Sequence, residues 1–395
     1  MRRWSRTSVQ LFLFLVVFSL LLLSSIVHDE RAIRSREAST AQPSFPTHFV
    51  AETFDDLDWS NACTTVKSYR GKSSPAAERR RQHQSREEGC DVFSGRWVYD
   101  NSSHPLYEEA SCPYMSDQLA CRKHGRPDEE YQRWRWQPHG CNLNKYVFSS
   151  IPVYMILLLC LVAETYHKEY DATIEFCWAP LLVESNSDDP VNHRSNDRII
   201  RPDTLGKHAG QWEKADILVF NSYLWWRSGQ KIKLLWKPDD DGICEEANGL
   251  DALKLAMETW ADWVASTVNH LAQKVFFVTM SPTHLWSREW NPGSEGNCFQ
   301  ETNPINEEGY WGSGSDMHTM QMVGSILGRL QTKVVVLNIT QLSEYRKDGH
   351  PSIYRKFWET HSPQQLANPV SYADCIHWCL PGVPDVWNEL LFNSL

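Results

Sequence analysis

Two residues near the C-terminus have the types and the spacing of an acid–base pair. Asp374 and His377 lie three residues apart, which in a helical turn would place both side chains on one face. A carboxylate beside an imidazole fixes the tautomer of the ring and stabilises the imidazolium that forms when the ring takes a proton from a nucleophile. Taken alone, an Asp-x-x-His pair is more often an ordinary surface contact, so the surrounding sequence must decide between the two.

The cysteines indicate a disulfide-bonded protein. The chain has 11 Cys, a high and odd number, which favours an oxidising compartment with at least one thiol left over. Cys90, Cys112, Cys121 and Cys141 are separated by 21, 8 and 19 residues. They lack the close Cys-x-x-Cys pairs of common zinc modules, so disulfides are favoured over zinc and no metal site is predicted.

Two further cysteines lie beside the acid–base pair. Cys375 and Cys379 flank His377, so disulfides there would tether the loop and fix the imidazole in place. A catalytic cysteine is the alternative, but disulfide formation would quench such a thiol.

The composition predicts a globular, acidic protein. Of 395 residues, 42% are hydrophobic, and 18 Trp, 14 Tyr and 15 Phe supply material for a large core. The 39 basic and 49 acidic residues leave a formal charge of −10. This argues against a nucleic-acid binder, which would need a basic face, and fits an uncharged or basic substrate better.

The N-terminus predicts a membrane anchor. Arg2, Arg3 and Arg6 precede an uncharged apolar run from Leu11 to Val27, which is at the short end of the lengths that cross a bilayer and also resembles a cleaved signal peptide. The positive flank and the length favour an uncleaved signal anchor, with everything after it in the lumen. We therefore expect a cytosolic tip and anchor at 1–27.

The remainder of the chain divides by composition. Residues 28–89 mix charges of both signs with little apolar periodicity and predict a disordered stem. Residues 90–142 form the cysteine-rich module, and 143–395 form the main domain. Sequons at Asn101 and Asn338 permit glycosylation in the lumen.

The main domain has the alternation of an α/β protein. Four stretches rich in β-branched and apolar residues predict strands, namely Thr173–Val183, Ala215–Asn221, Lys274–Met280 and Thr332–Asn338. Amphipathic periodicity predicts helices over Asp251–Leu271 and Met317–Leu330. This order predicts a parallel sheet covered by helices, with the active site at the carboxyl ends of the strands.

Several longer motifs resemble a known family. They are Val92–Asp100, Cys121–Trp136, Trp178–Ser185, Ser281–Trp286 and Tyr372–Asp385. Together they are similar to the plant trichome birefringence-like family of polysaccharide O-acetyltransferases, over nearly all of residues 90–395. Three more motifs resemble its xylan-acetylating branch, namely Phe220–Trp226, Asn338–His350 and Gln365–Asp374.

The resemblance implies a fold, a place and a reaction. It implies an SGNH-like three-layer sandwich with a central parallel sheet. It also implies a single-pass type II protein of the Golgi membrane with a lumenal catalytic domain, and xylan or a related cell-wall polysaccharide as the partner. No bound cofactor is implied, only an acetyl donor as co-substrate, and the sequence names neither that donor nor any protein partner.

One part of the family pattern is missing. The family carries a Gly-Asp-Ser motif after the first strand of its sheet, and the serine is the nucleophile, while its Asp-x-x-His corresponds to Asp374 and His377. No Gly-Asp-Ser occurs in this chain, and Gly314-Ser-Asp316 has the wrong order. Family-like sequence breaks off after Cys141 and resumes near Lys168. We interpret the domain as truncated around 143–168, by alternative splicing or an imperfect gene model, and expect the covalent step to be lost.

A substitute nucleophile is conceivable within this gap. The apolar run Ile151–Ala163 is too short to cross a bilayer, and it is followed by Glu164 and Thr165. Thr165 occupies the place of the missing serine by residue class. Its β-branched side chain and the alanine in place of the motif's glycine both argue against this role.

Other candidate residues come from the predicted strand ends and from the family positions. Asn221 could donate to an oxyanion or cap a turn, and His284 could contact substrate or serve the structure. Aromatic side chains that could stack on sugars are Trp225, Trp226, Trp286, Trp290 and Trp311. Cys244, Cys298, Cys375 and Cys379 match family cysteines and are expected in disulfides, whereas Cys63, Cys160 and Cys177 have no such match.

Three functions follow as hypotheses. The first is a Golgi polysaccharide O-acetyltransferase acting on xylan. The second is a non-catalytic glycan-binding or assembly partner that keeps the scaffold without the nucleophile. The third is a glycan acetylesterase, since the same triad passes acyl groups to water when water enters.

Overall fold

The computed structural model describes residues 65–68, 90–112, 115–143, 163–167, 172–190, 197–227, 231–236, 243–330, 333–357 and 360–395. The predicted anchor, nearly all of the predicted stem and most of the apolar run Ile151–Ala163 lie outside these ranges. Within them, no helix combines the length and the apolar character that crossing a membrane requires.

A parallel sheet lies at the centre of the main domain. Its strands are β7 (Ile217–Phe220), β10 (Lys274–Val278) and β11 (Val335–Leu337), in the order β11-β10-β7. Both pairings are parallel. The prediction of a parallel sheet built from these three stretches is confirmed.

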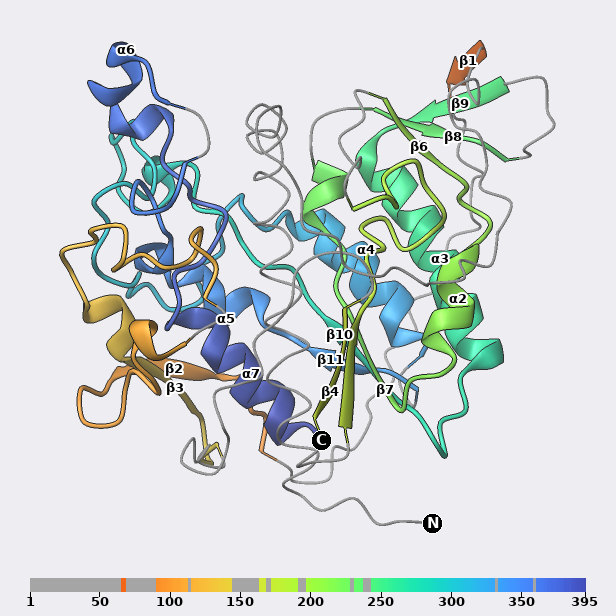
Figure 1. Ribbon diagram of the computed structural model, residues 1–395, viewed down its shortest axis with the longest axis horizontal. Coiled ribbons are helices and arrows are strands. Elements are labelled where there is room, and N and C mark those ends of the chain that lie inside the picture. The colour runs from red at the N-terminus through yellow and green to blue at the C-terminus, as the bar shows by residue number, and fades with distance from the viewer. Residues whose placement is uncertain are drawn as a thin grey trace, which may run out of the picture.

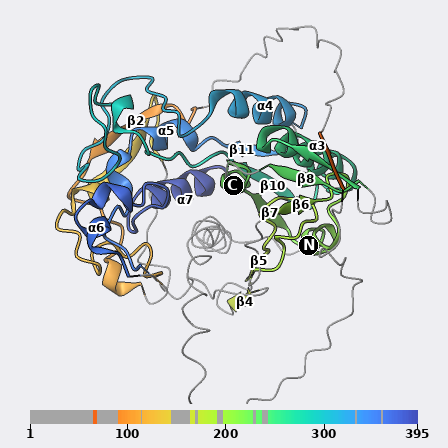
Figure 2. The same cartoon turned by 90° about the horizontal axis from the view of Figure 1, so that it is seen from above.

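Helices cover both faces of this sheet. Val275 and Phe277 of β10 belong to the core cluster of α3 (Gly249–Thr267) and α4 (Met317–Gly328), whereas Phe276 and Val278 belong to the cluster of α7 (Val383–Asn393). Successive side chains of a strand point to opposite faces, so the two clusters lie on opposite sides of the sheet. Figure 1 shows α3 on one side of the strands and α7 on the other, and Figure 2 shows α3 and α4 together over one face.

The two long helices begin at side-chain caps. Asn248 accepts a hydrogen bond from the backbone N–H of Asp251 at the start of α3, and Asp316 accepts one from Thr319 at the start of α4. Such caps satisfy backbone donors that the helix itself leaves unpaired. The segment Gly314-Ser-Asp316 is therefore a helix start. A Cβ atom at Gly314 would lie only 1.8 Å from the carbonyl oxygen of Thr283, so glycine is required there.

The predicted strand Thr173–Val183 is wrong in extent and in partner. β5 covers only Ala172–Phe176 and pairs antiparallel with β4 (Ala163–His167), outside the parallel sheet. Leu181, Leu182 and Val183, further along the predicted strand, are buried but not in a strand. Pro180 has no N–H to give to a sheet, and Leu182 has a positive φ of 63°. An apolar run at this position therefore forms a buried turn.

The remaining strands form smaller sheets. A mixed sheet has the order β1-β9-β8-β6, from β1 (Thr65–Ser68), β9 (Ile243–Ala247), β8 (Ile232–Leu234) and β6 (Arg198–Ile200). The cysteine-rich module contains the antiparallel pair β2 (Gly95–Tyr99) and β3 (Trp134–Pro138). Short helices are α2 (Lys207–Trp212), α5 (Thr340–Glu344) and α6 (Pro363–Leu366).

The cysteine-rich module packs directly on the C-terminal helix. Trp136 and Leu119 of the module share one core cluster with Trp387 of α7. The hydroxyl of Tyr107 donates to Asp385 of α7 across 3.3 Å, and the indole N–H of Trp97 donates to the Leu342 carbonyl at 2.7 Å. The module thus helps to hold α7 and the loop that precedes it.

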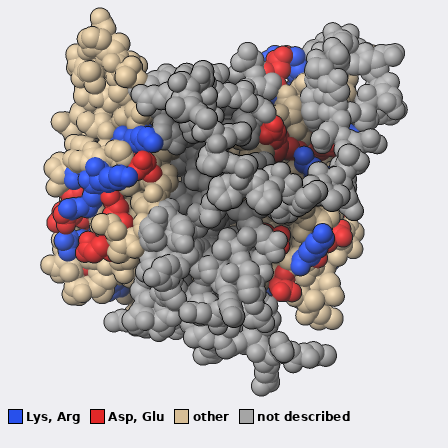
Figure 3. Space-filling view, in the orientation of Figure 1, with Lys and Arg blue, Asp and Glu red and all other residues tan. Residues whose placement is uncertain are grey.

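Charges of both signs mix on the flank that carries the module. Figure 3 shows Lys and Arg side chains interleaved with Asp and Glu there. Examples are the ion pairs Lys123–Asp117 and Arg135–Asp100. Alternation of this kind makes no continuous basic surface on that flank, in keeping with the acidic composition.

Glu389 should make folding stability depend on pH. Burial raises the pKa of this α7 carboxyl to about 8, with a further contribution from Asp385. The folded chain then holds a proton that the unfolded chain releases near its ordinary value, so the contribution of Glu389 to stability is full below about pH 4.5 and is lost as pH rises through 8. We expect Glu389→Gln to unfold at higher urea than the parent at pH 8 and at similar urea at pH 4.5. Glu213→Gln, on the surface, is the control, and equal shifts at both pH values would contradict the expectation.

Candidate active site

The acid–base pair is assembled. Oδ2 of Asp374 lies 2.6 Å from Nδ1 of His377, and both side chains are largely buried. Because the carboxylate bonds Nδ1, Nε2 is the nitrogen that would exchange a proton with a nucleophile. His377 also lines a pocket, so its ring lies beside a space that a substrate could enter.

The backbone that joins the pair is a turn and not a helix, so the prediction of a helical turn is wrong. Asp374 pairs with Ser352 in an isolated antiparallel bridge. Its Oδ1 then accepts hydrogen bonds from the backbone N–H groups of Ile376 and His377, both at 3.0 Å. An aspartate that bonds its own following amides forms such a turn readily. One carboxylate therefore shapes the loop with one oxygen and orients the imidazole with the other.

Disulfides hold this loop at both ends, as predicted. Cys298 pairs with Cys375, and Cys121 pairs with Cys379. All four of these cysteines are buried. His377 therefore lies between two covalent anchors, one to the main domain and one to the cysteine-rich module.

The other cysteine predictions have mixed outcomes. Cys90 pairs with Cys141 and Cys244 is also disulfide-bonded, both as predicted. Cys112 is not in a disulfide and keeps a buried thiol, so that prediction is wrong. Spacing along the chain does not reveal which thiols meet in space. Cys63 and Cys160 lie outside the described residues.

Arg355 is a site residue that the sequence did not reveal. It forms an ion pair with Oδ2 of Asp374, and its Nη1 lies 3.4 Å from Nδ1 of His377. Its side chain is 8% exposed, so water screens this contact little. The sequence spacing does not predict this contact, because Arg355 lies 19 residues before Asp374. The β-bridge between Ser352 and Asp374 brings the two segments together.

His284 lies behind the catalytic loop and is 1% exposed, away from any substrate surface. Its backbone N–H donates to the Cys375 carbonyl, and its Nε2 lies 2.8 Å from the Glu344 carbonyl oxygen. Its Nδ1 lies 2.7 Å from Nε2 of His350, whose own Nδ1 lies 2.7 Å from the His377 carbonyl oxygen. The two rings thus support the backbone of His377.

The two neutral rings of His284 and His350 carry one proton fewer than their three short polar contacts would need as hydrogen bonds. Carbonyl oxygens accept at both ends, so three hydrogen bonds need three protons, and two neutral imidazoles carry two. Burial lowers the pKa of His284 to about 4 and that of His350 well below its ordinary value. Burial also raises the pKa of the adjacent Glu344 to about 7. The two imidazoles behind His377 are therefore neutral at neutral pH, whereas Glu344 titrates close to it.

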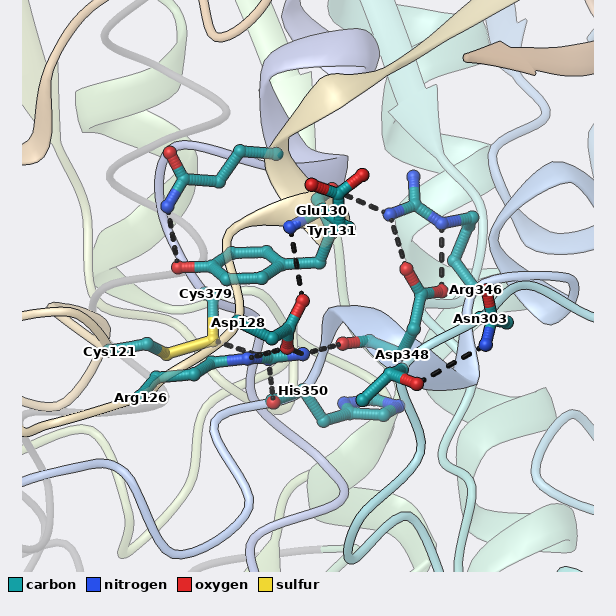
Figure 4. Close-up of polar contacts among 12 residues, drawn as sticks. Cys121, Arg126, Asp128, Glu130, Tyr131, Asn303, Arg346, Asp348, His350 and Cys379 are labelled. Carbon is teal, nitrogen blue, oxygen red and sulfur yellow. Dashed lines mark hydrogen bonds and ion pairs between the residues drawn. A yellow bond between two sulfur atoms is a disulfide. The ribbon is translucent and has the colours of Figure 1, made fainter. Parts of the chain in front are cut away.

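A second buried network fixes the residues around His350 (Figure 4). Arg126 of the cysteine-rich module donates to the carbonyls of His350 and Asp348, at 2.8 and 2.7 Å. Arg346 donates to both carboxylate oxygens of Asp348, and neither side chain is exposed. A buried bidentate pair of this kind restricts geometry strongly. The module thereby contributes to the rigidity of the site as well as to the core.

The pocket beside His377 lies at the carboxyl edge of the parallel sheet, where it was predicted. Its walls include Asn221 after β7, Ser281 after β10, and Trp225. Nδ2 of Asn221 donates to the Val278 and Thr279 carbonyls, at 3.1 and 3.3 Å. These contacts tie the end of β7 to the end of β10, and the contribution of Asn221 to an oxyanion site stays a prediction.

Two serine hydroxyls of the pocket have structural partners. Ser222 donates to the Pro180 carbonyl and accepts from the Trp226 indole, while Ser281 accepts from the Trp378 indole at 2.6 Å. Thr165 lies in the middle of β4, opposite Ile174, and not at a turn that follows a strand.

Within the described ranges, no group of three or more His, Cys, Asp or Glu residues could hold a metal ion.

The two sequons differ in their surroundings. Asn101 is exposed in a turn, next to exposed serines. Asn338 is also exposed, but its sequon threonine, Thr340, is fully buried and donates to the Met280 carbonyl. Glycosylation at both stays a prediction.

Three disulfides have both of their cysteines among the described residues. Removing Cys121–Cys379 should lower the free energy of unfolding more than removing either of the other two. Cys121–Cys379 joins residues 258 apart, against 77 for Cys298–Cys375 and 51 for Cys90–Cys141. Loop entropy predicts a loss of about 5 kcal/mol, and the buried sulfur atoms lose their packing as well. Urea unfolding of the Cys121→Ala/Cys379→Ala chain measures this, with Cys90→Ala/Cys141→Ala as the matched control. An equal or larger loss in the control would contradict the ranking.

Comparison with known proteins identifies the family. Residues 132–394 match the PC-Esterase family, described as the GDSL/SGNH-like acyl-esterase family found in Pmr5 and Cas1p. The chain belongs to this family. Residues 88–142 match the PMR5 N-terminal domain. The α/β fold with helices on both faces of the sheet is therefore the SGNH-like fold of the PC-esterases.

Individual relatives of this PC-esterase come from plants. Protein trichome birefringence-like 35 of Arabidopsis thaliana is 49% identical, with all of both chains covered. Probable xylan O-acetyltransferase 10 and xylan O-acetyltransferase 14 of Oryza sativa subsp. japonica are 46% and 43% identical, over 78% of this chain and 78% and 77% of theirs. The resemblance read from the motifs is confirmed.

The alignment with the Arabidopsis relative also shows how many positions this chain lacks. It spans 450 positions while covering a chain of 395 residues. About 55 positions of the alignment, the difference between the two, therefore have no residue of this chain. A deficit of that size accommodates a strand, a Gly-Asp-Ser turn and a helix.

Proposed function

We propose that this PC-esterase is a polysaccharide O-acetyltransferase whose substrate is xylan, and that the chain as written keeps the base of the site but lacks the nucleophile. The observation that carries the proposal is the Asp374–His377 pair, held by two disulfides in a pocket at the carboxyl edge of the sheet. The relatives named as xylan O-acetyltransferases support the choice of substrate.

The reaction divides between the residues present and the serine that is absent. With a serine restored beside His377, its oxygen attacks the acetyl carbonyl carbon while the hydroxyl proton passes to Nε2. The bond between the acetyl group and the donor then breaks, and Nε2 gives that proton to the leaving atom of the donor. A xylosyl hydroxyl next attacks the acetyl-serine, its proton passes to the same nitrogen, and the leaving serine oxygen takes that proton. Asp374 balances the charge of the imidazolium in both steps. No bound cofactor takes part, and the acetyl donor is a co-substrate.

A single assay distinguishes the acetyltransferase from the other two functions, the acetylesterase and the glycan-binding partner. Purified chain in which the missing segment has been restored after Cys141 is mixed with xylo-oligosaccharides and a labelled acetyl donor, and separately with acetylated xylo-oligosaccharides. Transfer of label supports the acetyltransferase, release of acetate supports an esterase, and binding with neither supports a glycan-binding partner. If the chain with the missing segment restored shows no transfer, the proposal is wrong.

We also propose that the protein is a single-pass type II protein of the Golgi membrane, with the residues after Val27 in the lumen. The basic residues before the apolar run support this orientation, and the disulfides of the described residues fit an oxidising compartment. Protease treatment of intact Golgi vesicles should leave the region after Cys90 uncut until detergent is added. Cutting without detergent would overturn the topology.

A further inference from the structure

One of the five tryptophans that could stack on a sugar differs from the others in its exposure. Trp286 is 48% exposed, whereas Trp226 is 4% exposed. The rings of Trp225, Trp290 and Trp311 are half-buried. Stacking on a sugar needs an open ring face, so exposure favours Trp286 among the five candidates.

The polar contacts of these rings differ in the same way. The indole N–H of Trp226 donates to the Ser222 hydroxyl at 2.9 Å, and that of Trp290 donates to the Glu301 carboxylate at 2.7 Å. Their polar atoms therefore serve the protein interior. The Trp286 ring instead lies under the guanidinium of Arg288, whose Cζ is 4.9 Å from the ring centroid. A cation over one face of an indole orients the ring and leaves the opposite face for another group.

Trp286 lies in a segment that is tied to the catalytic loop. Two residues before it, the backbone N–H of His284 donates to the Cys375 carbonyl at 3.1 Å. At the start of the same segment, Ser281 lines the pocket and accepts a hydrogen bond from the Trp378 indole at 2.6 Å. The segment that carries Trp286 therefore runs from the pocket wall along the loop that holds the base.

Leu285 adds a second exposed apolar side chain to this segment. It is 38% exposed. Among the described residues, Leu285 and Trp286 are the only two neighbours along the chain whose large hydrophobic side chains are both exposed. Single exposed apolar residues are ordinary on protein surfaces, whereas clustered ones point to a surface that another molecule covers. The position beside the pocket indicates that this molecule is the one whose end or side group enters the pocket.

We propose that Leu285 and Trp286 form a platform that binds the xylan main chain, with a xylosyl unit stacked on Trp286 next to the unit whose hydroxyl lies at His377. This inference rests on the proposed function, because it takes the pocket to hold the acceptor. A xylosyl ring is uncharged, carries its hydroxyl groups around its edge and has C–H groups on its faces. Such a face packs well against an indole ring. A polymer that reaches the base must also continue beyond the pocket, and the platform lies beside it.

The test measures binding and contains no acetyl donor. Xylohexaose is titrated into the chain as written, and the heat of binding gives the Kd. Trp286→Ala is expected to bind about five- to tenfold more weakly, because one aromatic contact contributes a factor of that size. Trp286→Phe keeps a ring and should recover part of the affinity.

Leu271→Ala is the matched control. Leu271 is fully exposed and lies before β10, whereas Trp286 lies after it, so the control removes an exposed apolar side chain at the opposite end of the strand. It should bind xylohexaose like the parent. The proposal is overturned if folded Trp286→Ala binds with the parent Kd, or if the parent does not bind xylohexaose. Should Trp286→Ala fail to fold, hydroxyl-radical footprinting of the parent decides, since xylohexaose should slow oxidation of Trp286 and not of Leu271.

Two further measurements separate this proposal from its alternatives. Sedimentation of the parent without sugar tests a second copy of the chain as the occupant, and a dimer that Trp286→Ala dissociates would overturn the xylan platform. Transfer assays on the chain with the missing segment restored test the proposed function independently. Binding that depends on Trp286 without any transfer in the restored chain would keep the platform and remove the acetyltransferase. Transfer with an unchanged KM for xylohexaose in restored Trp286→Ala would remove the platform alone.

Discussion

A chain in which the missing segment is restored after Cys141 is expected to transfer acetyl groups to xylo-oligosaccharides at least 10³-fold faster than the chain as written. A base without a nucleophile cannot form the acyl-enzyme, and losing one member of a triad costs on the order of 10³ to 10⁶ in rate. The pair that would activate the serine already stands 2.6 Å apart on a tethered loop. The residues to insert can be copied from the Arabidopsis relative, whose alignment has about 55 positions without a counterpart here.

The control for this restoration is the same insertion with alanine in place of the motif serine. That chain regains the strand and the helix but not the nucleophile, so it should fold like the restored chain and stay inactive. Equal activity in the serine and alanine insertions would show that the new segment acts by stabilising the fold. The acid–base assignment would then be wrong.

In the restored chain, His377→Ala is expected to lower the transfer rate by about 10³ to 10⁴, and Asp374→Asn by a comparable factor. The imidazole is the only part of the pair that moves protons. The aspartate holds its tautomer and also accepts two backbone hydrogen bonds within the loop. Because the disulfides hold the loop at Cys375 and Cys379, His377→Ala should leave the melting temperature within a few degrees of the parent.

Ile376→Ala is the matched control for the histidine variant. Ile376 lies between the two anchors and is 36% exposed, so its truncation shortens a side chain of the same loop but keeps the backbone N–H that donates to Asp374. It should keep most of the activity. If His377→Ala fails to fold while Asp374→Asn is fully active, the pair is structural.

The parts of the fold that the sequence predicted are those in which burial follows a regular period. β7, β10 and β11 are short apolar runs, of which β10 is buried on both faces from Val275 to Val278, and α3 has a buried stripe that includes Trp260. Burial at 177–183 has no such period. Leu181 and Val183 are fully buried in a turn that Pro180 and a left-handed Leu182 produce, and an apolar run alone does not distinguish a buried turn from a buried strand.

The candidate site was predicted in its chemistry but not in its geometry. Residue types identified Asp374 and His377, and the flanking cysteines identified the tethered loop. The turn itself depends on the β-bridge between Asp374 and Ser352. That bridge brings Arg355 close enough to form an ion pair with the Asp374 carboxylate. Contacts between segments this far apart leave no local pattern. For the same reason the pairing of Cys121 with Cys379 and the buried thiol of Cys112 could not be read from spacing.

The most direct test of the central claim compares the chain exactly as written with its own His377→Ala variant. Both proteins are incubated with xylo-oligosaccharides and labelled acetyl donor, and the acetylated product is counted. An assembled base without a nucleophile predicts that the two rates are the same and no higher than the rate without protein. Robust transfer by the unaltered chain that disappears in His377→Ala would contradict the account, and its loss in Thr165→Ala as well would identify Thr165 as the substitute nucleophile.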